Sequence, residues 1–432
     1  MLNQKQLQPA NVVIRGARVL DPTEGIDATL DVRIDGGTIA AVAEQVDTNE
    51  HRVIDAAGLV LAPAFVDPHV HLRTPGREDE ETLASGTAAA AAGGYCAILA
   101  MPNTDPVIDS AAKLGALVET AQREAEVPVG FLAAITRSQK GEELTEMAEL
   151  ADAGAVGFSD DGVPVASAAL MRRALQYASI TGRKLAVHCE EPTLSRGGHV
   201  HEGRVAAEVG FAGYPSVAES VAVERDLALA AYEAQPVHVL HLSAVDSVEA
   251  LRRARAAGVA ASGEATPHHL VLTDEAVRSL DPNVKMNPPL RAEQDRLALL
   301  EGLRDGTIEA IATDHAPHAA YEKEVPFEAA PFGVTGLETA FAALYTHLVE
   351  PGLLPLETLL ERMSAGPARI FGLDRPRVSS GAPANLVLLD LDREWTVGEQ
   401  PFRSRSRNSW LLGSTLRGAV RMTLAGGAVA YE

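Results

Sequence analysis

The sequence predicts an α/β fold in which a parallel α/β barrel is joined to a small β-domain built by both ends of the chain. Between residues 63 and 372, short apolar runs alternate with alanine-rich stretches, which is the pattern of βαβ units and a parallel sheet. Residues 1–62 and 373–432 instead contain strand-like runs punctuated by glycine. We therefore expect a barrel domain over residues 63–372 and one β-domain whose two parts are residues 1–62 and 373–432.

Each element can be assigned in chain order from these patterns. Strands of the β-domain are expected at residues 12–16, 31–37, 38–42, 385–390 and 418–427. Strands of the barrel are expected on the apolar runs 58–66, 96–100, 155–158, 185–187, 237–240 and 308–313. Alanine-rich residues 84–92 and 166–180 are expected to be helices, because each precedes a strand of the barrel.

Composition and charge exclude several classes of partner. The chain has 432 residues, of which 46% are hydrophobic and 22% charged, as is ordinary for a globular protein. Its formal net charge of −22 argues against nucleic acids and anionic membranes as partners. No apolar run approaches the roughly 20 residues of a membrane span. The two cysteines, Cys96 and Cys189, imply no disulfide framework, so we expect a cytoplasmic location.

Metal-ligand residue types follow one predicted strand after another. His69 and His71 stand two residues apart at the end of the first barrel strand, so their side chains point to the same face. Positions of the same kind are held by Asp160, Asp161, His188, His241 and Asp314. Because parallel barrel strands end at one rim, we expect these side chains to meet there. Such a set exceeds one tetrahedral zinc site and fits two metals that share a bridging carboxylate.

Other histidines fit this pattern less well. His199 and His201 form a second His-x-His pair, but they follow a glycine pair and no strand, so we expect no metal there. His268 and His269 follow a proline and are expected to orient or pack rather than to bind metal.

Taken in order, the motifs resemble one enzyme family. They are His69-Val70-His71, Met101-Pro102-Asn103-Thr104, Asp160-Asp161-Gly162, His188, His241 and Asp314-His315-Ala316-Pro317-His318. Over nearly the whole chain this order resembles the dihydroorotases of the amidohydrolase superfamily, above all the long-chain bacterial type called class I. The resemblance implies a TIM (β/α)8 barrel with a composite terminal β-domain, and two zinc ions or another divalent metal. It also implies reversible cyclisation of N-carbamoyl-L-aspartate to L-dihydroorotate in pyrimidine synthesis.

The resemblance further implies a role for individual residues. The ligands of one metal would be His69, His71 and Asp314, and those of the other His188 and His241. The bridging position falls in Asp160-Asp161, where the family match favours Asp161. Asp314 would also be the catalytic proton carrier. Substrate contacts would come from His71, Arg73, Asn103, Asn287, His318, Phe332 and Gly333.

Two physical arguments from the residues agree with these roles. Arg73 shares strand parity with His71, so it faces the same pocket, where its guanidinium can hold a carboxylate through two parallel hydrogen bonds. Many relatives bridge their metals with a carboxylated lysine, and Lys184 is the one rival for that role here. Lys184 precedes His188 by about 13 Å of strand, at about 3.3 Å per residue, which places it near the opposite mouth of the barrel.

Three alternative functions remain at this point. Dihydropyrimidinase (hydantoinase) and allantoinase share the barrel and the His-x-His motif, but they need no arginine for a substrate carboxylate. Some dihydroorotase-like chains only scaffold aspartate carbamoyltransferase and have lost ligand histidines, whereas every ligand position is intact here. We expect a small-molecule substrate. The sequence leaves open whether the chain forms a homo-oligomer or associates with aspartate carbamoyltransferase.

Overall fold

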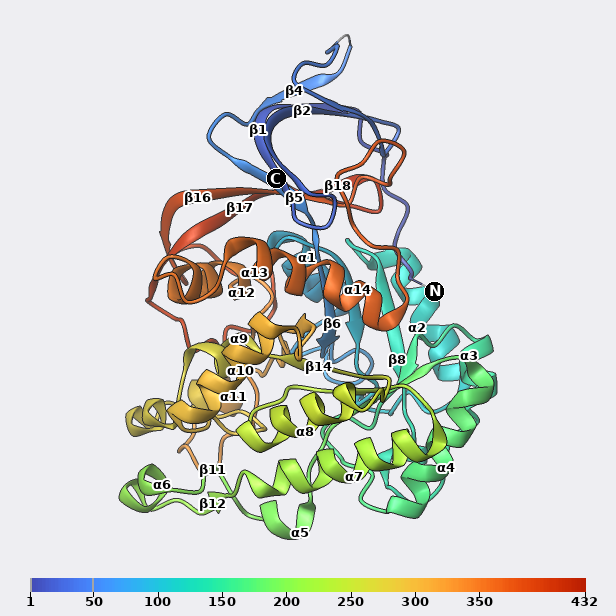
Figure 1. The fold of residues 1–432 in the computed structure, drawn as a ribbon, viewed down its shortest axis with the longest axis vertical. Helices are drawn as coiled ribbons and strands as arrows, with labels where there is room; N and C mark the ends of the chain where they lie inside the picture. Colours follow the sequence, from blue (N-terminus) through green and yellow to red (C-terminus); the bar gives the residue numbers. More distant parts are fainter. Residues whose placement is uncertain (1, 49) are drawn as a thin grey trace.

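The computed structural model describes residues 2–48 and 50–432 and shows a barrel of strands below a separate terminal sheet (Figure 1). The barrel strands are β6 (Phe65–Val70), β7 (Tyr95–Ala100), β8 (Val129–Ala133), β9 (Gly157–Phe158), β10 (Lys184–Val187), β13 (Val237–Val239), β14 (Ala261–Ala265) and β15 (Ala310–Ile311). They lie side by side in chain order, each parallel to its neighbours. A parallel bridge between Val70 and His315 joins the last strand to the first and closes the barrel.

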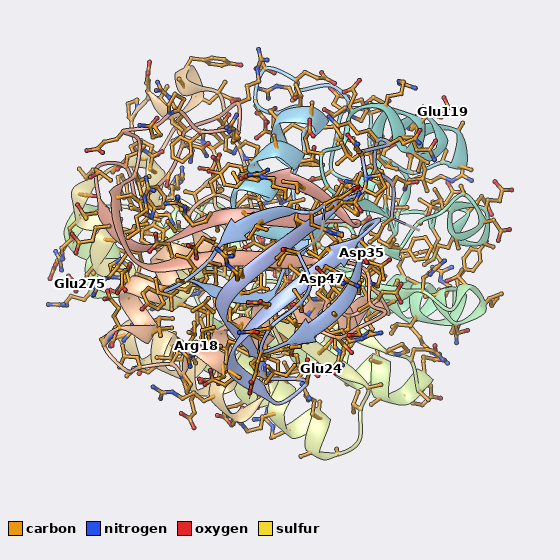
Figure 2. The ribbon with its side chains drawn as sticks, turned by 90° about the horizontal axis from the view of Figure 1, so that it is seen from above. Arg18, Glu24, Asp35, Asp47, Glu119 and Glu275 are labelled. Carbon is orange, nitrogen blue, oxygen red and sulfur yellow. The ribbon has the colours of Figure 1, made fainter. Side chains whose placement is uncertain are left out.

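The terminal sheet combines strands from both ends of the chain. They are β1 (Val12–Asp21), β2 (Ile26–Asp35), β3 (Thr38–Ala43), β4 (Arg52–Asp55), β5 (Val60–Pro63), β16 (Leu386–Thr396), β17 (Thr415–Ala425) and β18 (Ala428–Tyr431). The two ends meet where β5 pairs antiparallel with β16, in the order β18-β17-β16-β5-β1-β2-β3, and β4 adds to β1. Viewed from above, Arg18, Glu24 and Asp35 mark this sheet, while Glu119 and Glu275 lie towards the edge of the molecule (Figure 2).

Helices surround the barrel and fill the connections between its strands. The α-helices are α1 (Leu83–Ala92), α2 (Ala111–Glu124), α3 (Met147–Asp152), α4 (Ala168–Thr181), α5 (Pro192–Ser195), α6 (Arg204–Val209), α7 (Val217–Glu233), α8 (Val245–Ala256), α9 (Pro267–Val271), α10 (Glu293–Asp305), α11 (Ala320–Lys323), α12 (Ala340–Leu344), α13 (Leu356–Met363) and α14 (Ala365–Phe371). Short 3₁₀ turns are η1 (Arg137–Gln139), η2 (Asp274–Ser279) and η3 (Pro282–Val284), and η4 (Tyr345–Val349) is a π-helical turn. A small outer ribbon pairs β11 (Val200–His201) with β12 (Gly213–Tyr214).

Local sequence explains where the helices begin. Thr82 precedes α1 and accepts a hydrogen bond from the amide of Ser85, whose hydroxyl accepts in return from the amide of Thr82. This reciprocal capping satisfies two amides that a helix start leaves without partners. Ser167 caps α4 with a single bond, because its hydroxyl accepts a hydrogen bond from the amide of Leu170.

A layer of apolar side chains inside the barrel packs against the end of α14. Leu99, Leu132 and Ala186 belong to one buried cluster with Ile370 and Phe371, the last two residues of α14. His188, His241 and Asp314 come after the ends of β10, β13 and β15. The layer therefore positions a polar site at the carboxyl ends of the strands, as in other barrels of this type.

One element differs from its sequence prediction. The apolar run 58–66 was expected to be a single strand, but the structure divides it into β5 and β6 on either side of Ala64. Ala64 donates its amide to Asn385 and accepts a hydrogen bond from Ser364, so its backbone bonds leave both sheets. Both strands are buried, so the run is apolar throughout. The apolar pattern therefore gives no sign that the chain passes from the terminal sheet to the barrel within this run. The predicted domain boundary between residues 62 and 63 lies inside β5, one residue before that strand ends.

The predicted fold class is confirmed in its main features. The barrel and the composite terminal sheet are both present in the described residues. No helix in the described part of the chain has the length and apolar character needed to cross a membrane.

Candidate metal centre and active site

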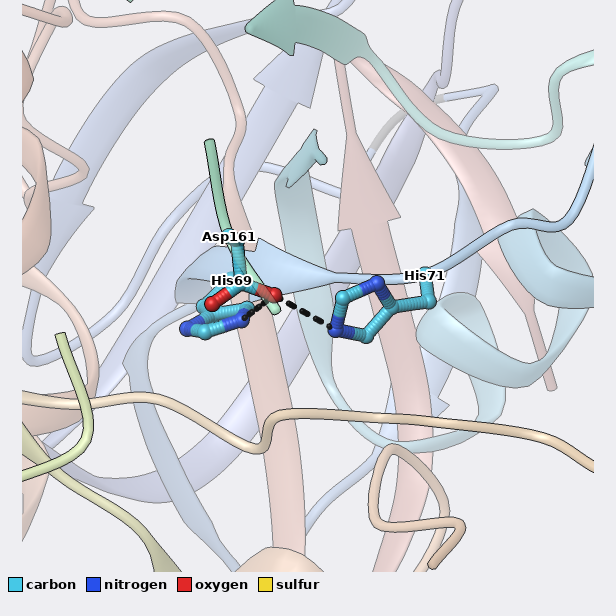
Figure 3. Close-up of side chains that lie close together, drawn as sticks. All are labelled: His69, His71 and Asp161. Carbon is cyan, nitrogen blue, oxygen red and sulfur yellow. Dashed lines mark ion pairs between the residues drawn. The ribbon is translucent and has the colours of Figure 1, made fainter. Parts of the chain in front are cut away.

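Side chains from β6 and from the end of β9 meet at the carboxyl rim of the barrel. The Nε2 atoms of His69 and His71 each lie 3.4 Å from Oδ2 of Asp161 (Figure 3). All three side chains are buried. The two imidazoles converge because alternate residues of a strand share a face, as the His-x-His spacing predicts.

The other oxygen of Asp161 faces a second pair of histidines. Nδ1 of His188, after β10, lies 3.4 Å from Oδ1 of Asp161, and Nε2 of His241, after β13, lies 3.3 Å from the same atom. The two imidazole nitrogens are 2.8 Å apart. One carboxylate therefore separates two histidine pairs, with one oxygen directed at each.

Asp314 completes the first half of the cluster from the end of β15. Its Oδ1 lies 3.1 Å from Nε2 of His71 and 3.4 Å from Nε2 of His69. Burial opposes ionisation, but His69, His71 and His241 outweigh it and hold the pKa of Asp314 well below its usual range. Asp314 is therefore an ionised carboxylate that can accept a proton.

Three residues of this rim have strained backbones. Arg73, His241 and Asp314 have positive φ values of 56°, 29° and 48°, a region that residues with a Cβ rarely adopt. Such strain persists where surrounding contacts hold it, and it gathers at functional sites. The turns after β6, β13 and β15 are thus held in the conformation that directs these side chains inward.

The donor atoms at the rim fit a metal. Nε2 of His69 and Oδ1 of Asp161 are buried without a hydrogen-bond partner among the described residues, which is costly unless another group fills the gap. Imidazole nitrogens and carboxylate oxygens are the donors that zinc prefers. Two groups, His69-His71-Asp161 and Asp161-His188-His241, bring their ligand atoms within 4.8 Å of one another.

Acidic and amide side chains orient the imidazoles from behind. Glu264 of β14 accepts hydrogen bonds from His69 Nδ1 at 2.7 Å and from His238 Nε2 at 2.9 Å. Asn103 Oδ1 accepts from His71 Nδ1 at 2.8 Å, and Glu190 accepts from His188 Nε2 at 2.9 Å. Such partners fix which imidazole nitrogen faces a metal.

Sequence reasoning missed both glutamates. A charged residue inside the buried strand 261–265 was a usable signal for Glu264. Glu190 follows His188 by two residues, the spacing that also marks the His69 and His71 pair.

The structure separates the two neighbouring aspartates. Asp160 turns away from the histidines and accepts hydrogen bonds from the amides of Ile135 and Thr136, at 2.8 and 3.1 Å. Asp161 alone faces the cluster. Lys184, at the first residue of β10, has Glu309 as its charged neighbour and is absent from the ligand groups.

Arg73 lies beside the cluster but has a protein partner. Its Nε is 2.9 Å from Glu80 and donates a hydrogen bond to the carbonyl of Pro317 at 3.1 Å. Among the described residues, the Pro317 carbonyl is the one hydrogen-bond acceptor of the Arg73 side chain, so its two terminal nitrogens remain for a ligand. Glu80 was not predicted from the sequence.

A pocket of about 250 Å³ opens next to the second histidine pair. Glu190, Asn287 and Phe332 line it together with Tyr214 and neighbouring backbone. Asn287 donates its amide nitrogen to Glu190 at 3.2 Å, while its Oδ1 is buried without a partner among the described residues. That oxygen is a free acceptor for a ligand N–H.

His318, Phe332 and Gly333 form one hydrogen-bonded unit. The carbonyl of Phe332 accepts from His318 Nε2 at 2.8 Å, and Asn408 accepts from the His318 amide at 3.0 Å and donates to the Gly333 carbonyl at 3.2 Å. The Gly333 amide donates to Lys285. These backbone groups, predicted to close on a substrate ring, are thus already engaged within the protein. Asn408, from the terminal β-domain, was not anticipated.

Four other histidines, His199, His201, His268 and His269, belong to neither of these two ligand groups. His269 donates a hydrogen bond from Nε2 to the Pro288 carbonyl at 2.9 Å, its Nδ1 lies 2.7 Å from the Thr266 hydroxyl, and its ring packs against His268. His201 lies 3.4 Å from Arg291. Neither it nor His199 belongs to a ligand group among the described residues. A third group, Glu80-His318-Glu322, gathers beside Arg73.

Comparison with known proteins agrees with this geometry. Residues 58–247 match the family model described as Dihydro-orotase-like. The chain is 44% identical over 423 residues to a protein named dihydroorotase from Syntrophus aciditrophicus (strain SB), covering 98% of this chain and 99% of that protein. The chain belongs to the dihydroorotase family. A dihydroorotase from Geobacillus kaustophilus (strain HTA426) is 46% identical over 403 residues, 93% of this chain and 94% of that protein.

Solved structures of relatives share the whole architecture of this dihydroorotase family member. An L-hydantoinase (dihydropyrimidinase) from Arthrobacter aurescens aligns with a TM-score of 0.88 and 27% identity, over 98% of this chain and 96% of that one. A dihydropyrimidinase from Brevibacillus agri NCHU1002, at 24% identity and a TM-score of 0.83, shares the fold over 98% of this chain and 95% of that one. The predicted family and the predicted cyclic amidohydrolase class are confirmed, whereas the roles of single residues stay predictions.

Proposed function

We propose that this protein is a dihydroorotase that interconverts N-carbamoyl-L-aspartate and L-dihydroorotate with two divalent metal ions, zinc in the first instance. The observation that carries the proposal is the arrangement of Asp161, whose two oxygens face two separate histidine pairs. A carboxylate so placed would serve as a ligand to a metal ion held by either histidine pair. Full-length identity of 44% to a protein named dihydroorotase supports the choice of substrate.

The metal ligands would be His69, His71 and Asp314 on one side, His188 and His241 on the other, and Asp161 between them. When bound, divalent ions there supply Lewis-acid polarisation of the substrate carbonyl. The residues behind the ligands keep the imidazoles aimed at the ions.

Asp314 carries the proton in this proposal. In hydrolysis it accepts a proton from the attacking water and delivers it to the ring nitrogen as the ring C–N bond breaks. In synthesis it takes the proton from the carbamoyl nitrogen as the C–N bond forms and water departs. Its low pKa keeps the carboxylate ionised at neutral pH.

Arg73 and Asn287 recognise the substrate in this proposal. The terminal nitrogens of Arg73 bind the ring carboxylate, which no dihydrouracil or hydantoin ring carries. The free Oδ1 of Asn287 accepts a ring N–H from the pocket beside His188. His318, with Glu80, supports the loop behind Arg73.

Steady-state kinetics on three rings test the proposal. The wild type should turn over L-dihydroorotate and act poorly on dihydrouracil and hydantoin, because these rings offer no carboxylate to the terminal nitrogens of Arg73. Arg73→Met should lower kcat/KM for L-dihydroorotate by about 100-fold or more and change that for dihydrouracil little.

Arg253→Met is the control, since this exposed arginine of α8 pairs with Glu224 and shares no ion-pair partner with Arg73. It should retain dihydroorotate turnover. Comparable wild-type rates on hydantoin and L-dihydroorotate would instead make the protein a hydantoinase.

The proposal also includes two assemblies, a homo-oligomer and a complex with aspartate carbamoyltransferase. Sedimentation tests the homo-oligomer, and co-purification tests the complex.

A further inference from the structure

A second cavity lies between the barrel helices and the terminal sheet. Its volume is about 660 Å³, which is within the range of small-molecule sites. Its wall is formed by the end of α1, by α12, by β16 and β17, and by the connection between these two strands. It shares no lining residue with the pocket beside the metal centre.

Aromatic side chains are concentrated at this cavity. Only 4% of the chain is aromatic, yet Phe341, Trp395, Phe402 and Tyr431 all line it. The indole of Trp395 donates its N–H to the carbonyl of Gly418 at 3.1 Å, which fixes the orientation of the ring. Such rings offer flat apolar faces on which a planar ligand can stack.

Positive charge is also concentrated there. Arg393, Arg403 and Arg421 line the cavity, although the chain as a whole carries a net charge of −22. Arg393 and Arg403 make no ion pair with any described residue, and Arg421 reaches Asp390 only at 3.7 Å. Guanidinium groups without partners beside aromatic faces suit an anionic ligand with a planar ring.

Acidic residues at the cavity offset this charge only in part. The carboxylate of Glu338 already accepts hydrogen bonds from the amides of Arg403 and Ser404, at 3.0 Å each. Burial raises the pKa of Glu338 to about 7, so its negative charge is incomplete at neutral pH. Glu432 forms an ion pair with Arg52.

The same wall continues to the active site. After Arg403, Ser404 and Arg405 hydrogen-bond to Glu81, which also lies 3.2 Å from His315, next to Asp314. Further along the segment 402–408, Asn408 holds the amide of His318 at 3.0 Å. A change at the cavity can therefore shift groups that support the reacting residues.

We propose that this cavity binds an anionic ligand with a planar aromatic ring, of the size of a nucleoside monophosphate, and that its binding alters turnover through segment 402–408. The ring stacks on Trp395 and Phe402, and the anionic group binds Arg393 and Arg403. Nothing in the proposed dihydroorotase reaction requires this site.

Tryptophan fluorescence tests the site directly, because the chain has only two tryptophans, Trp395 and Trp410. The metal-loaded protein is titrated with uridine 5′-monophosphate and adenosine 5′-monophosphate. Uridine, adenosine and inorganic phosphate are the partial ligands. We expect saturable quenching with a Kd below about 1 mM for at least one monophosphate, and binding about tenfold weaker for the partial ligands. Trp395→Phe should remove the signal, and Trp410→Phe should keep it.

Variants and kinetics complete the test. The double variant Arg393→Ala and Arg403→Ala should bind about tenfold more weakly or worse, with basal activity unchanged, while Arg253→Ala, an exposed arginine on α8, should bind normally. Saturating ligand should change kcat or KM by about twofold or more in the wild type and not in the double variant. Absent quenching, or equal quenching in the double variant, would overturn the site. Binding with unchanged kinetics would overturn the link to turnover. The titration requires no substrate, so its result is independent of the proposed reaction.

Discussion

The two halves of the metal centre use the same ligand types but are supported differently. In the half built on β6, His69 is held by Glu264, and both side chains are fully buried in the barrel. In the half built on β10 and β13, His188 is held by Glu190, whose side chain is 15% exposed and lines the pocket beside it. Asp161 belongs to both halves.

We expect this difference to separate metal retention from substrate binding. Glu264 also bonds His238 and the amide of His241, so it is part of the barrel interior. Glu190 also bonds Asn287, the predicted substrate contact. The first half is thus fixed by packing, while the second shares its support with the substrate pocket.

The largest expected effect comes from the residue common to both halves. Asp161→Ala should lose both metals and all measurable activity, because each histidine pair then faces a site without its shared carboxylate. His241→Ala should reduce metal content in the second half and leave the fold intact, since the residue follows its strand. Metal analysis and circular dichroism measure both results.

Lys184→Ala is the control for the bridge. It should remain active without added bicarbonate, because Lys184 lies at the start of β10, away from the ligands. An inactive Lys184→Ala protein rescued by a short carboxylic acid would show that a carboxylated lysine bridges the metals.

Asp314→Asn tests the chemistry of the first half. Turnover should fall by roughly 100- to 10,000-fold, since the amide cannot accept the proton. Metal content should fall much less, because His69, His71 and Asp161 remain. Single-turnover rates and metal analysis separate the two effects, and a variant with most of its rate at neutral pH would move the proton carrier to another residue, with His318 the next to test.

Matched substitutions behind the histidines should distinguish the halves. Glu264→Gln should weaken metal binding by about 10- to 100-fold, since it removes the charge behind His69. Glu190→Gln should weaken metal binding less and raise KM, because Asn287 loses its charged partner as well. Competition with a zinc chelator measures the metal affinity of each variant, and steady-state kinetics measure its KM. Equal effects of the two variants on KM would contradict the expectation that only the second half shares its support with the substrate pocket.

The last prediction concerns the pH dependence of metal binding in the second half. Burial lowers the pKa of His188, but Asp161 and Glu190 outweigh burial and raise it to about 10 in the metal-free protein. A metal must then displace this proton, so affinity should fall as the pH falls below that pKa, by about tenfold per pH unit for each proton displaced. Glu190→Gln should lower the pKa and bring the affinity to its plateau at a lower pH. Chelator competition from pH 6 to pH 9 measures the slope, and a flat wild-type profile would rule out the displaced proton.

The sequence by itself determined the barrel, the composite sheet and the group of candidate ligands. Strand–helix alternation and strand parity are local properties, and all parallel strands end at one rim. His69 and His71, or His188 and His241, could therefore be grouped without knowing any distance. The same reasoning excluded Lys184, because strand length alone separates it from His188.

Only the tertiary structure decided which residues support these ligands. Asp160 and Asp161 are equivalent in the pattern, and the turn after β9 directs Asp161 to the histidine cluster and Asp160 to Thr136. Glu264 bonds His69 from 195 positions away, and Asn408 reaches His318 across 90 positions. Such contacts depend on how distant segments pack against one another in the closed barrel and its terminal domain. The local spacing of residues along the chain carries no information about them.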